Sequence, residues 1–141
     1  MAYRSDRQSS RIVRLAMVSS FIPRACGIAT FADDLLGALH EQAIDGHVFA
    51  VEGAGGQYLY DPRVVGTFTD SCAGDYARVA AEINAGDFEL LNVQHEFGLY
   101  GGDTCDALAQ LLAAVEIPVV TTLHTIPAAP PARVRRTLRG V

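Results

Sequence analysis

Five short apolar runs, separated by longer mixed segments, set the plan of this 141-residue chain. The runs cover residues 12–19, 46–52, 64–69, 88–94 and 117–124. They are continuous rather than alternately apolar and polar, which is typical of parallel strands buried on both faces. Because helical segments separate most of these runs, the pattern predicts an α/β fold, a Rossmann-like doubly wound domain with one parallel sheet.

Apolar residues recur at helical spacing in three of the intervals between the runs. The first helix is expected over residues 30–43, with Thr30 as its cap and Asp33 closing a weak capping box. A second helix is expected to stop at Gly86, and a third to begin at Asp103. The apolar residues expected on the three buried faces are Phe31, Leu35, Leu36 and Leu39; Tyr76, Val79, Ala80 and Ile83; and Leu108, Leu111, Leu112 and Val115.

The length of the chain fits one domain. We expect residues 1–10 to be a flexible tail and residues 11–141 to form a single Rossmann-like domain. No apolar stretch is long enough to span a bilayer, and the N-terminus lacks an apolar segment of signal type, so a cytoplasmic protein is expected. The cysteines are scattered and odd in number, which favours free thiols over a disulfide framework; they are Cys26, Cys72 and Cys105.

The charged residues exclude several functions. All eleven basic residues are arginine, so the chain has no P-loop lysine, Schiff-base lysine or kinase strand lysine. Residues 15–131 contain only Arg24, Arg63 and Arg78 against fifteen Asp and Glu. This acidic body argues against nucleic-acid binding, and it implies that the cations for a phosphate-bearing ligand come from elsewhere.

Two histidines, His95 and His124, stand at the ends of the fourth and fifth expected strands. In open α/β sheets, ligands bind at the carboxyl ends of the strands, where the strand order reverses. For the order 3-2-1-4-5 this point lies between the first and fourth strands. Residues 20–31 and 95–103 would then face each other across one crevice, with residues 124–131 beside them.

Other chemistries fit these loops less well. A dinucleotide site needs G-x-G-x-x-G after the first strand, where this chain has Gly27 alone, and a partial match at residues 53–58 lacks the last glycine. A Cys26–His95 nucleophile pair stays open, although Cys26 fits better as a small residue in a tight turn. Neither a metal nor a bound cofactor is expected, because no recognised ligand spacing joins Cys26, His95, Glu96 and His124.

Three segments, in order and in spacing, resemble the signature segments of one family: FIPRACGIATFADDL at 21–35, NVQHEFGLYGG at 92–102 and PVVTTLHT at 118–125. The family is glycosyltransferase family 4, whose members are retaining enzymes of two-domain GT-B architecture. The resemblance covers about residues 12–130 and concerns the N-terminal domain. It implies a glycosyltransferase fragment, the acceptor-side half of a GT-B enzyme that is truncated before the donor-binding domain.

The resemblance also implies partners and roles. A nucleotide-sugar donor, bound by a separate or missing C-terminal domain, would give its sugar to a sugar or lipid acceptor, and a lipid acceptor would bring contact with a membrane surface. His95 matches the histidine at the reacting centre, where an imidazole can hydrogen-bond a sugar hydroxyl and support positive charge on the ring. The loop approached by the donor phosphate and sugar matches Cys26, Gly27 and Ile28. Acceptor or loop contacts match Glu96, Phe97, Gly98, Tyr100, Gly101, Gly102 and His124.

The donor-domain features of the family, an E-x7-E element and basic residues for the phosphates, have no counterpart here. We therefore expect the chain alone to transfer no sugar and to bind nucleotide sugars weakly or not at all. Without a second domain, an exposed apolar rim is expected from Phe21, Phe97, Leu99 and Tyr100. The alternative is a non-catalytic sugar- or partner-binding module that keeps the Rossmann-like shell.

Overall fold

The computed structural model describes residues 11–53, 55–101 and 106–130, together with residues 132, 135 and 139. Its elements follow in the order β1 (Val13–Ser19), α1 (Gly27–His40), β2 (Ile44–Glu52), β3 (Val64–Thr69), α2 (Ala73–Ala85), β4 (Leu90–His95), α3 (Asp106–Ala114) and β5 (Val119–Leu123). All five predicted strands are confirmed, with ends that differ from the prediction by at most a few residues. The predicted tail at residues 1–10, the cap at Asp103 and most of residues 131–141 lie outside the described residues.

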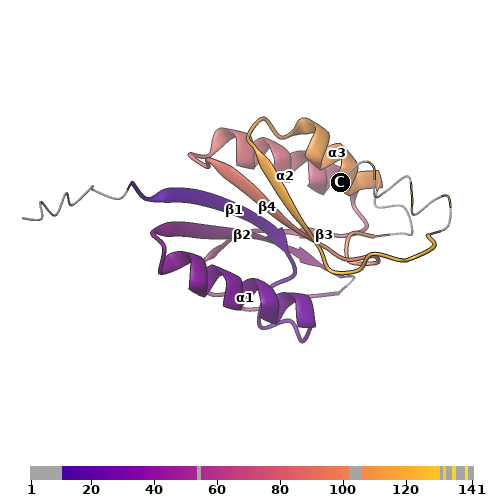
Figure 1. The fold of residues 1–141 in the computed structure, drawn as a ribbon, viewed down its shortest axis with the longest axis horizontal. Helices are drawn as coiled ribbons and strands as arrows, with labels where there is room; N and C mark the ends of the chain where they lie inside the picture. The colour runs from indigo at the N-terminus through magenta and orange to yellow at the C-terminus, as the bar shows by residue number, and fades with distance from the viewer. Residues whose placement is uncertain are drawn as a thin grey trace, which may run out of the picture.

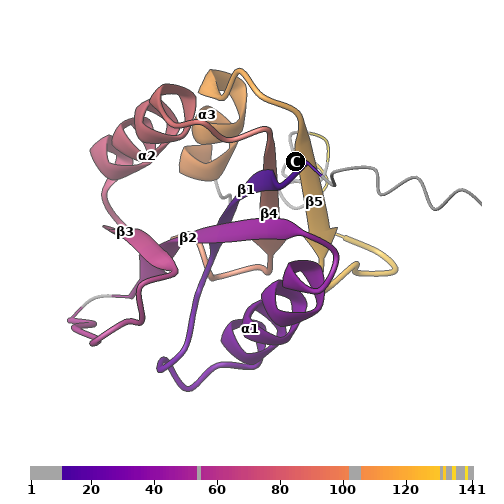
Figure 2. The ribbon, with the colours of Figure 1, turned by 90° about the vertical axis from the view of Figure 1, so that its left-hand side faces the viewer.

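The five strands form one sheet in the order β3-β2-β1-β4-β5, and every neighbouring pair is parallel. This is the predicted Rossmann-like order. β1 and β4 are neighbours, so the chain changes direction across the sheet between them, and β3 and β5 form the two edges (Figure 2).

The sheet is covered unequally on its two faces. α1 lies alone on one face, and α2 and α3 lie together on the other (Figures 1 and 2). The larger apolar cluster joins the sheet to α2 and α3, including Val93, Ile83 and Leu111. The smaller cluster joins it to α1, including Met17 and Leu36. Among the described residues no helix has the length and apolar character needed to cross a bilayer.

The start and the buried face of α1 differ from the prediction. α1 begins at Gly27, three residues before the expected cap, and Thr30 lies inside the helix, where its hydroxyl donates to the Cys26 carbonyl at 3.4 Å. Phe31, expected on the buried face, is 42% exposed. The residues buried against the sheet are instead Ala29, Ala32 and Leu36. Small side chains at the first two positions let the helix approach the strands, which turns Phe31 outward.

Candidate functional site

The carboxyl ends of β1, β4 and β5 bring together the two histidines that the sequence singles out. In the β4–β5 ladder His95 pairs with Leu123, and the amide of His124 donates to the His95 carbonyl at 3.0 Å. The start of α1 reaches the same edge, because the Phe31 ring meets the His124 ring edge-on with centroids 4.9 Å apart. The three loops expected at one crevice therefore do converge.

The two imidazoles nevertheless lie on opposite faces of the sheet. Successive side chains of a strand point to alternate faces. His95 packs on the α2–α3 side, edge-on to Phe97 at 5.0 Å and stacked on Tyr100 at 6.4 Å between centroids. His124 lies on the α1 side, where its Nε2 is 2.8 Å from Gln94 Oε1. The candidate site is thus divided by the sheet itself.

His95 is fully buried, and neither ring nitrogen has a hydrogen-bond partner among the described residues. Burial is the main cause that lowers the pKa of its imidazole; Glu96 raises it and His124 lowers it further. A buried ring with a lowered pKa is neutral near pH 7, with one nitrogen available as donor and the other as acceptor. Both ring nitrogens therefore remain able to hydrogen-bond a ligand, and leaving these buried polar atoms unpaired is costly in free energy.

The loop that follows His95 is held by its own groups. The Glu96 carboxylate accepts from the Phe97 amide at 2.9 Å and from the Thr125 hydroxyl at 2.6 Å. Gly98 and Gly101 have φ of 84° and 70°, a region that side chains other than glycine rarely adopt. A Cβ at Gly101 would lie 2.3 Å from the Asp70 carbonyl oxygen. These contacts anchor the loop against β5 and the β3–α2 turn.

Tyr100 is part of the core rather than of an open rim. Its hydroxyl lies 2.7 Å from the Gln94 carbonyl oxygen and 3.0 Å from that of Val18, and it is fully buried. Tyr76 donates in turn to the Tyr100 carbonyl at 2.8 Å. Tyr100 therefore fastens the loop to the ends of β1 and β4, and this geometry favours packing over contact with a sugar.

The expected exposed apolar rim is wrong for three of its four residues. Phe21 and Tyr100 are 0% exposed, and Leu99 is 7% exposed; Phe97 is half-buried. The two loops after β1 and β4 fold their apolar side chains inward, onto the two clusters. Exposed apolar side chains occur instead in the loops after β2 and β5 and in α1; they are Tyr58, Leu59, Ile126 and Phe31, of which Leu59 is 97% exposed.

On the α1 face, His124 ends a ladder of polar side chains. Gln94 bonds His124, and its amide nitrogen also lies 3.5 Å from Thr122 Oγ1. Asn92 donates weakly to the Val120 carbonyl at 3.4 Å. Neither Asn92 nor Gln94 is among the site residues predicted from the sequence. Their spacing of two inside an otherwise apolar run is the signal of one polar line on one face of β4.

The start of α1 places hydrogen-bond donors and one arginine around Cys26. Burial tends to raise the pKa of the Cys26 thiol, but the Ser20 hydroxyl at 3.5 Å, the amides of Ala29 and Ile28 and the Arg24 guanidinium together hold that pKa below its usual value. Gly27 is exposed, has an ordinary φ, and an added Cβ would meet nothing within 4 Å. The fold therefore does not require glycine at this position. Ile28 is half-buried against the larger cluster.

Arg24 differs from the other two arginines of the acidic body. Arg63 is paired with Asp33 and Asp61 at 2.7 and 2.6 Å, and Arg78 with Glu82 at 2.7 Å. Arg24 donates to the Val51 carbonyl at 3.1 Å, and no described carboxylate forms an ion pair with it. A guanidinium with donors to spare thus stands close to Cys26 at the start of α1.

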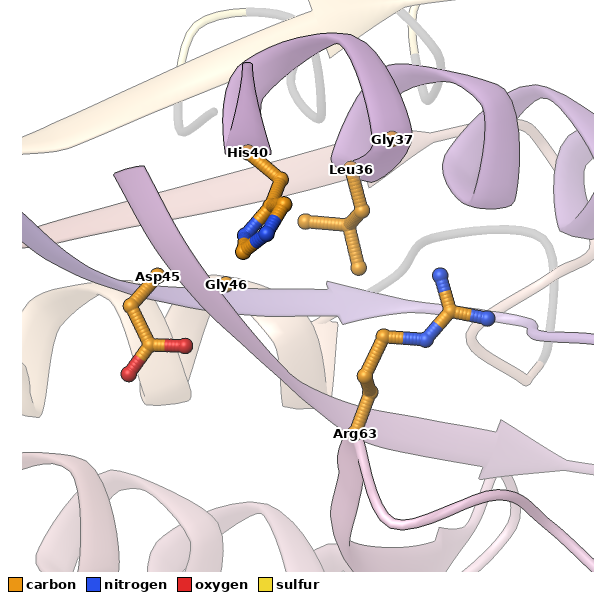
Figure 3. Close-up of a pocket in the computed structure, with 6 residues that line it drawn as sticks. All are labelled: Leu36, Gly37, His40, Asp45, Gly46 and Arg63. Carbon is orange, nitrogen blue, oxygen red and sulfur yellow. The ribbon is translucent and has the colours of Figure 1, made fainter. Parts of the chain in front are cut away.

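A hollow of about 310 Å³ lies elsewhere, beside the C-terminal half of α1. Figure 3 shows its lining residues, Leu36, Gly37, His40, Asp45, Gly46 and Arg63. Its charged groups already have partners, because Arg63 pairs with Asp33 and Asp61, and Asp45 with His47 at 2.9 Å. The hollow lies at the starts of β2 and β3, away from His95 and His124, so it is not part of the candidate site.

Three further predictions concern Gly102, a metal ion and the cysteines. Gly102 lies outside the described residues. Within the described part of the chain, no group of three or more His, Cys, Asp or Glu side chains is placed to hold a metal ion. Cys26 precedes the first residue of α1 rather than filling a tight turn, and Cys26 and Cys72 are free thiols.

Comparison with known proteins supports the fold. No protein-family model matches the chain, and no curated protein matches its sequence. A solved structure of an alpha-glucosyltransferase, in complex with UDP and a 13-mer DNA containing a central A:G mismatch, matches with a TM-score of 0.52 and 12% sequence identity. The match covers 90% of this chain and 35% of that enzyme, which is a GT-B glycosyltransferase outside family 4. The chain thus has a Rossmann-like α/β fold that resembles part of a GT-B glycosyltransferase.

Proposed function

We propose that this chain is the acceptor-side domain of a retaining, family 4-like glycosyltransferase that uses a nucleotide sugar and needs a donor-binding domain for turnover. The observation that carries the proposal is Gly27: a glycine that the fold does not require, in the first turn of the helix that follows β1. A helix N-terminus favours phosphate through its free amides and its dipole. The amides of Ala29 and Ile28 in this turn also help to lower the pKa of Cys26, after the Ser20 hydroxyl and ahead of Arg24.

His95 is the proposed catalytic residue. A neutral imidazole can bond a sugar hydroxyl and stabilise charge developing on the ring, without acting as a base. Because His95 is fully buried, contact with a sugar requires movement of the residues packed over it, of which Phe97 is half-buried and next to Gly98. His124 would meet the acceptor from the α1 face.

The acceptor class is proposed from charge. The matched enzyme was solved with DNA, but the body of this chain is acidic, with its arginines between Leu15 and Pro131 mostly paired to carboxylates. A sugar or lipid acceptor suits this surface better than a polyanion. The alternative, a non-catalytic sugar-binding module, would use the same rim but would gain no activity from a donor domain.

The test compares two glycines of α1. Gly27 and Gly37 are both exposed, and an added Cβ would meet nothing within 4 Å of either, but only Gly27 lies at the rim. Alanine at either position should keep or raise stability by up to about 1 kcal/mol. In amide NMR titrations with UDP, we expect weak binding at the start of α1, reduced at least about tenfold in Gly27→Ala and unchanged in Gly37→Ala.

A transfer assay separates the enzyme from the binding module. The chain alone should transfer no sugar, and addition of a donor-binding domain with a nucleotide sugar should restore transfer that His95→Ala abolishes. In the UDP titrations, if Gly27→Ala and Gly37→Ala weaken binding equally, the proposal that the phosphates bind at the start of α1 is wrong. Turnover by the purified chain alone would refute the half-enzyme proposal.

A further inference from the structure

The two edge strands, β3 and β5, differ in how well they are protected against pairing with another chain. At the β3 edge, Arg78 donates to the Thr67 carbonyl at 2.8 Å, and the Thr69 amide donates to the Asp75 carboxylate at 2.9 Å. The register of β3 with β2 also shifts between Val48 and Phe49. Side-chain partners and irregular pairing of this kind keep an edge strand from pairing with other chains.

The β5 edge has none of these protections among the described residues. Residues 117–126 contain no Asp, Glu or Arg, and β5 pairs with β4 in unbroken register. Val119 and Val120 point to opposite faces, yet they are 37% and 51% exposed, so neither face is covered at this point. Figure 2 shows β5 at one edge of the sheet, beside β4.

The ladder hydrogen bonds show which residues of β5 face outward. The Leu91 amide donates to the Pro118 carbonyl, and the His124 amide donates to the His95 carbonyl. In a parallel ladder, alternate residues direct both backbone groups to the same neighbour. The even-numbered residues of β5 therefore bond β4, and the amides and carbonyls of Val119, Thr121 and Leu123 point away from the sheet.

We propose that β5 is a self-association edge, at which a second copy of this chain pairs in antiparallel orientation about a two-fold axis at Thr121. The three outward-facing residues are symmetric about Thr121. In this register Thr121 bonds the partner's Thr121, and Val119 and Leu123 bond the partner's Leu123 and Val119. All six outward backbone groups are then satisfied with none left over.

The side chains suit the same symmetry. A two-fold axis sets identical strands against each other, so a charged strand would face its own charge. β5 has no such charge, and it would set Thr121 against the partner's Thr121 and Val119 against the partner's Leu123. On the α1 face, the exposed Val120 would meet the partner's Thr122. A pairing of five residues buries little area, so a weak, concentration-dependent dimer is expected.

The test uses sedimentation equilibrium on the full 141-residue chain and three variants. Thr121→Pro removes an outward-facing amide without touching the bonds to β4, and Val120→Lys places a charge beside the axis. Val65→Lys is the matched control, because Val65 is 49% exposed on the other edge strand. We expect wild type and Val65→Lys to dimerise alike, and each β5 variant to raise the dissociation constant at least about tenfold. Circular dichroism confirms that each variant is folded.

The register is tested separately by oxidising Thr121→Cys and mapping the linked peptides by mass spectrometry. Opposed residues of an antiparallel pair lie within disulfide distance, so a 121–121 link is expected. A chain that stays monomeric at millimolar concentration, or a dimer that Val65→Lys weakens as much as Val120→Lys, overturns the proposal. A dimer lacking the 121–121 link would place the second copy elsewhere.

Discussion

The α2–α3 face and the α1 face of the same sheet differ in how completely they are covered. The first is closed up to the rim, where Tyr100 and His95 are fully buried. The second has one helix for five strands, a hollow beside that helix and a polar line along β4. The larger apolar cluster lies on the closed face, and the accessible part of the candidate site lies at the start of α1 and on the open face: Cys26, Gly27 and His124.

The largest expected effect comes from truncating the core on each face. Ile83→Ala removes a fully buried side chain between α2 and the sheet and should cost about 4 kcal/mol of unfolding free energy. Leu36→Ala on the α1 face should cost about 2 kcal/mol, because the space left would join the existing hollow, where water can enter. Urea unfolding measures both. Equal losses would mean that the two faces are equally well packed.

A second pair of substitutions tests the closure of the rim. Gly101→Ala combines a φ of 70° with a clash against the Asp70 carbonyl and should cost about 3 kcal/mol. Gly55→Ala has a similar φ of 81° but no neighbour within 4 Å, and should cost only about 1 kcal/mol. Thermal unfolding compares them. If Gly101→Ala is the milder change, the loop after β4 is not locked to the β3–α2 turn.

Tyr100→Phe isolates one hydroxyl on the closed face. The substitution leaves the carbonyls of Val18 and Gln94 without that donor and should cost about 1–2 kcal/mol. Tyr58→Phe, on an exposed ring, serves as the control and should change stability by less than about 0.5 kcal/mol. A loss near zero for Tyr100→Phe would reopen a ligand-contacting role for this residue.

The smallest effect is the pH dependence contributed by His95. Its pKa is lowered in the folded chain, mainly by burial, so at mildly acidic pH the unfolded chain binds the proton more readily. This contribution to stability is full above the unfolded value of about 6.5 and is lost as the pH falls through the lower, folded value. His95→Leu should therefore flatten the loss of stability on acidification, as measured by urea unfolding at pH 8 and pH 5.5. An unchanged pH profile would show that His95 is solvated.

The sequence predicts the strands of this fold more fully than the exposure of its rim. Apolar runs such as 64–69 mark the parallel strands almost to the residue, but β3 and β5, which form the two edges, are only partly buried. The start of α1 was missed because Cys26 offers none of the usual cap chemistry, and the structure shows no side-chain cap bond there. The burial of Phe21 and Tyr100 depends on the path of two loops in three dimensions, which no local spacing specifies.

The placement of the two histidines shows the same limit at the site. Both positions at strand ends are readable from the sequence, and they do lie side by side along the backbone. Their separation onto opposite faces follows from the ladder register, which sets His95 against Leu123 rather than against His124. A shift of β5 by one residue against β4 would have placed both rings on one face, so the β4–β5 register decides whether the two imidazoles can act on one ligand.

The bond from the His124 amide to the His95 carbonyl closes the β4–β5 ladder at the rim. Ladders fray from their ends, so this single N–H exchanges with deuterium only as often as the rim itself opens. The exchange rate of the His124 amide therefore measures how often the rim opens, and this opening would let a ligand reach the buried His95 ring. If a nucleotide bound at the start of α1 slows the exchange of the His124 amide, then binding in one half of the site reduces opening in the other half.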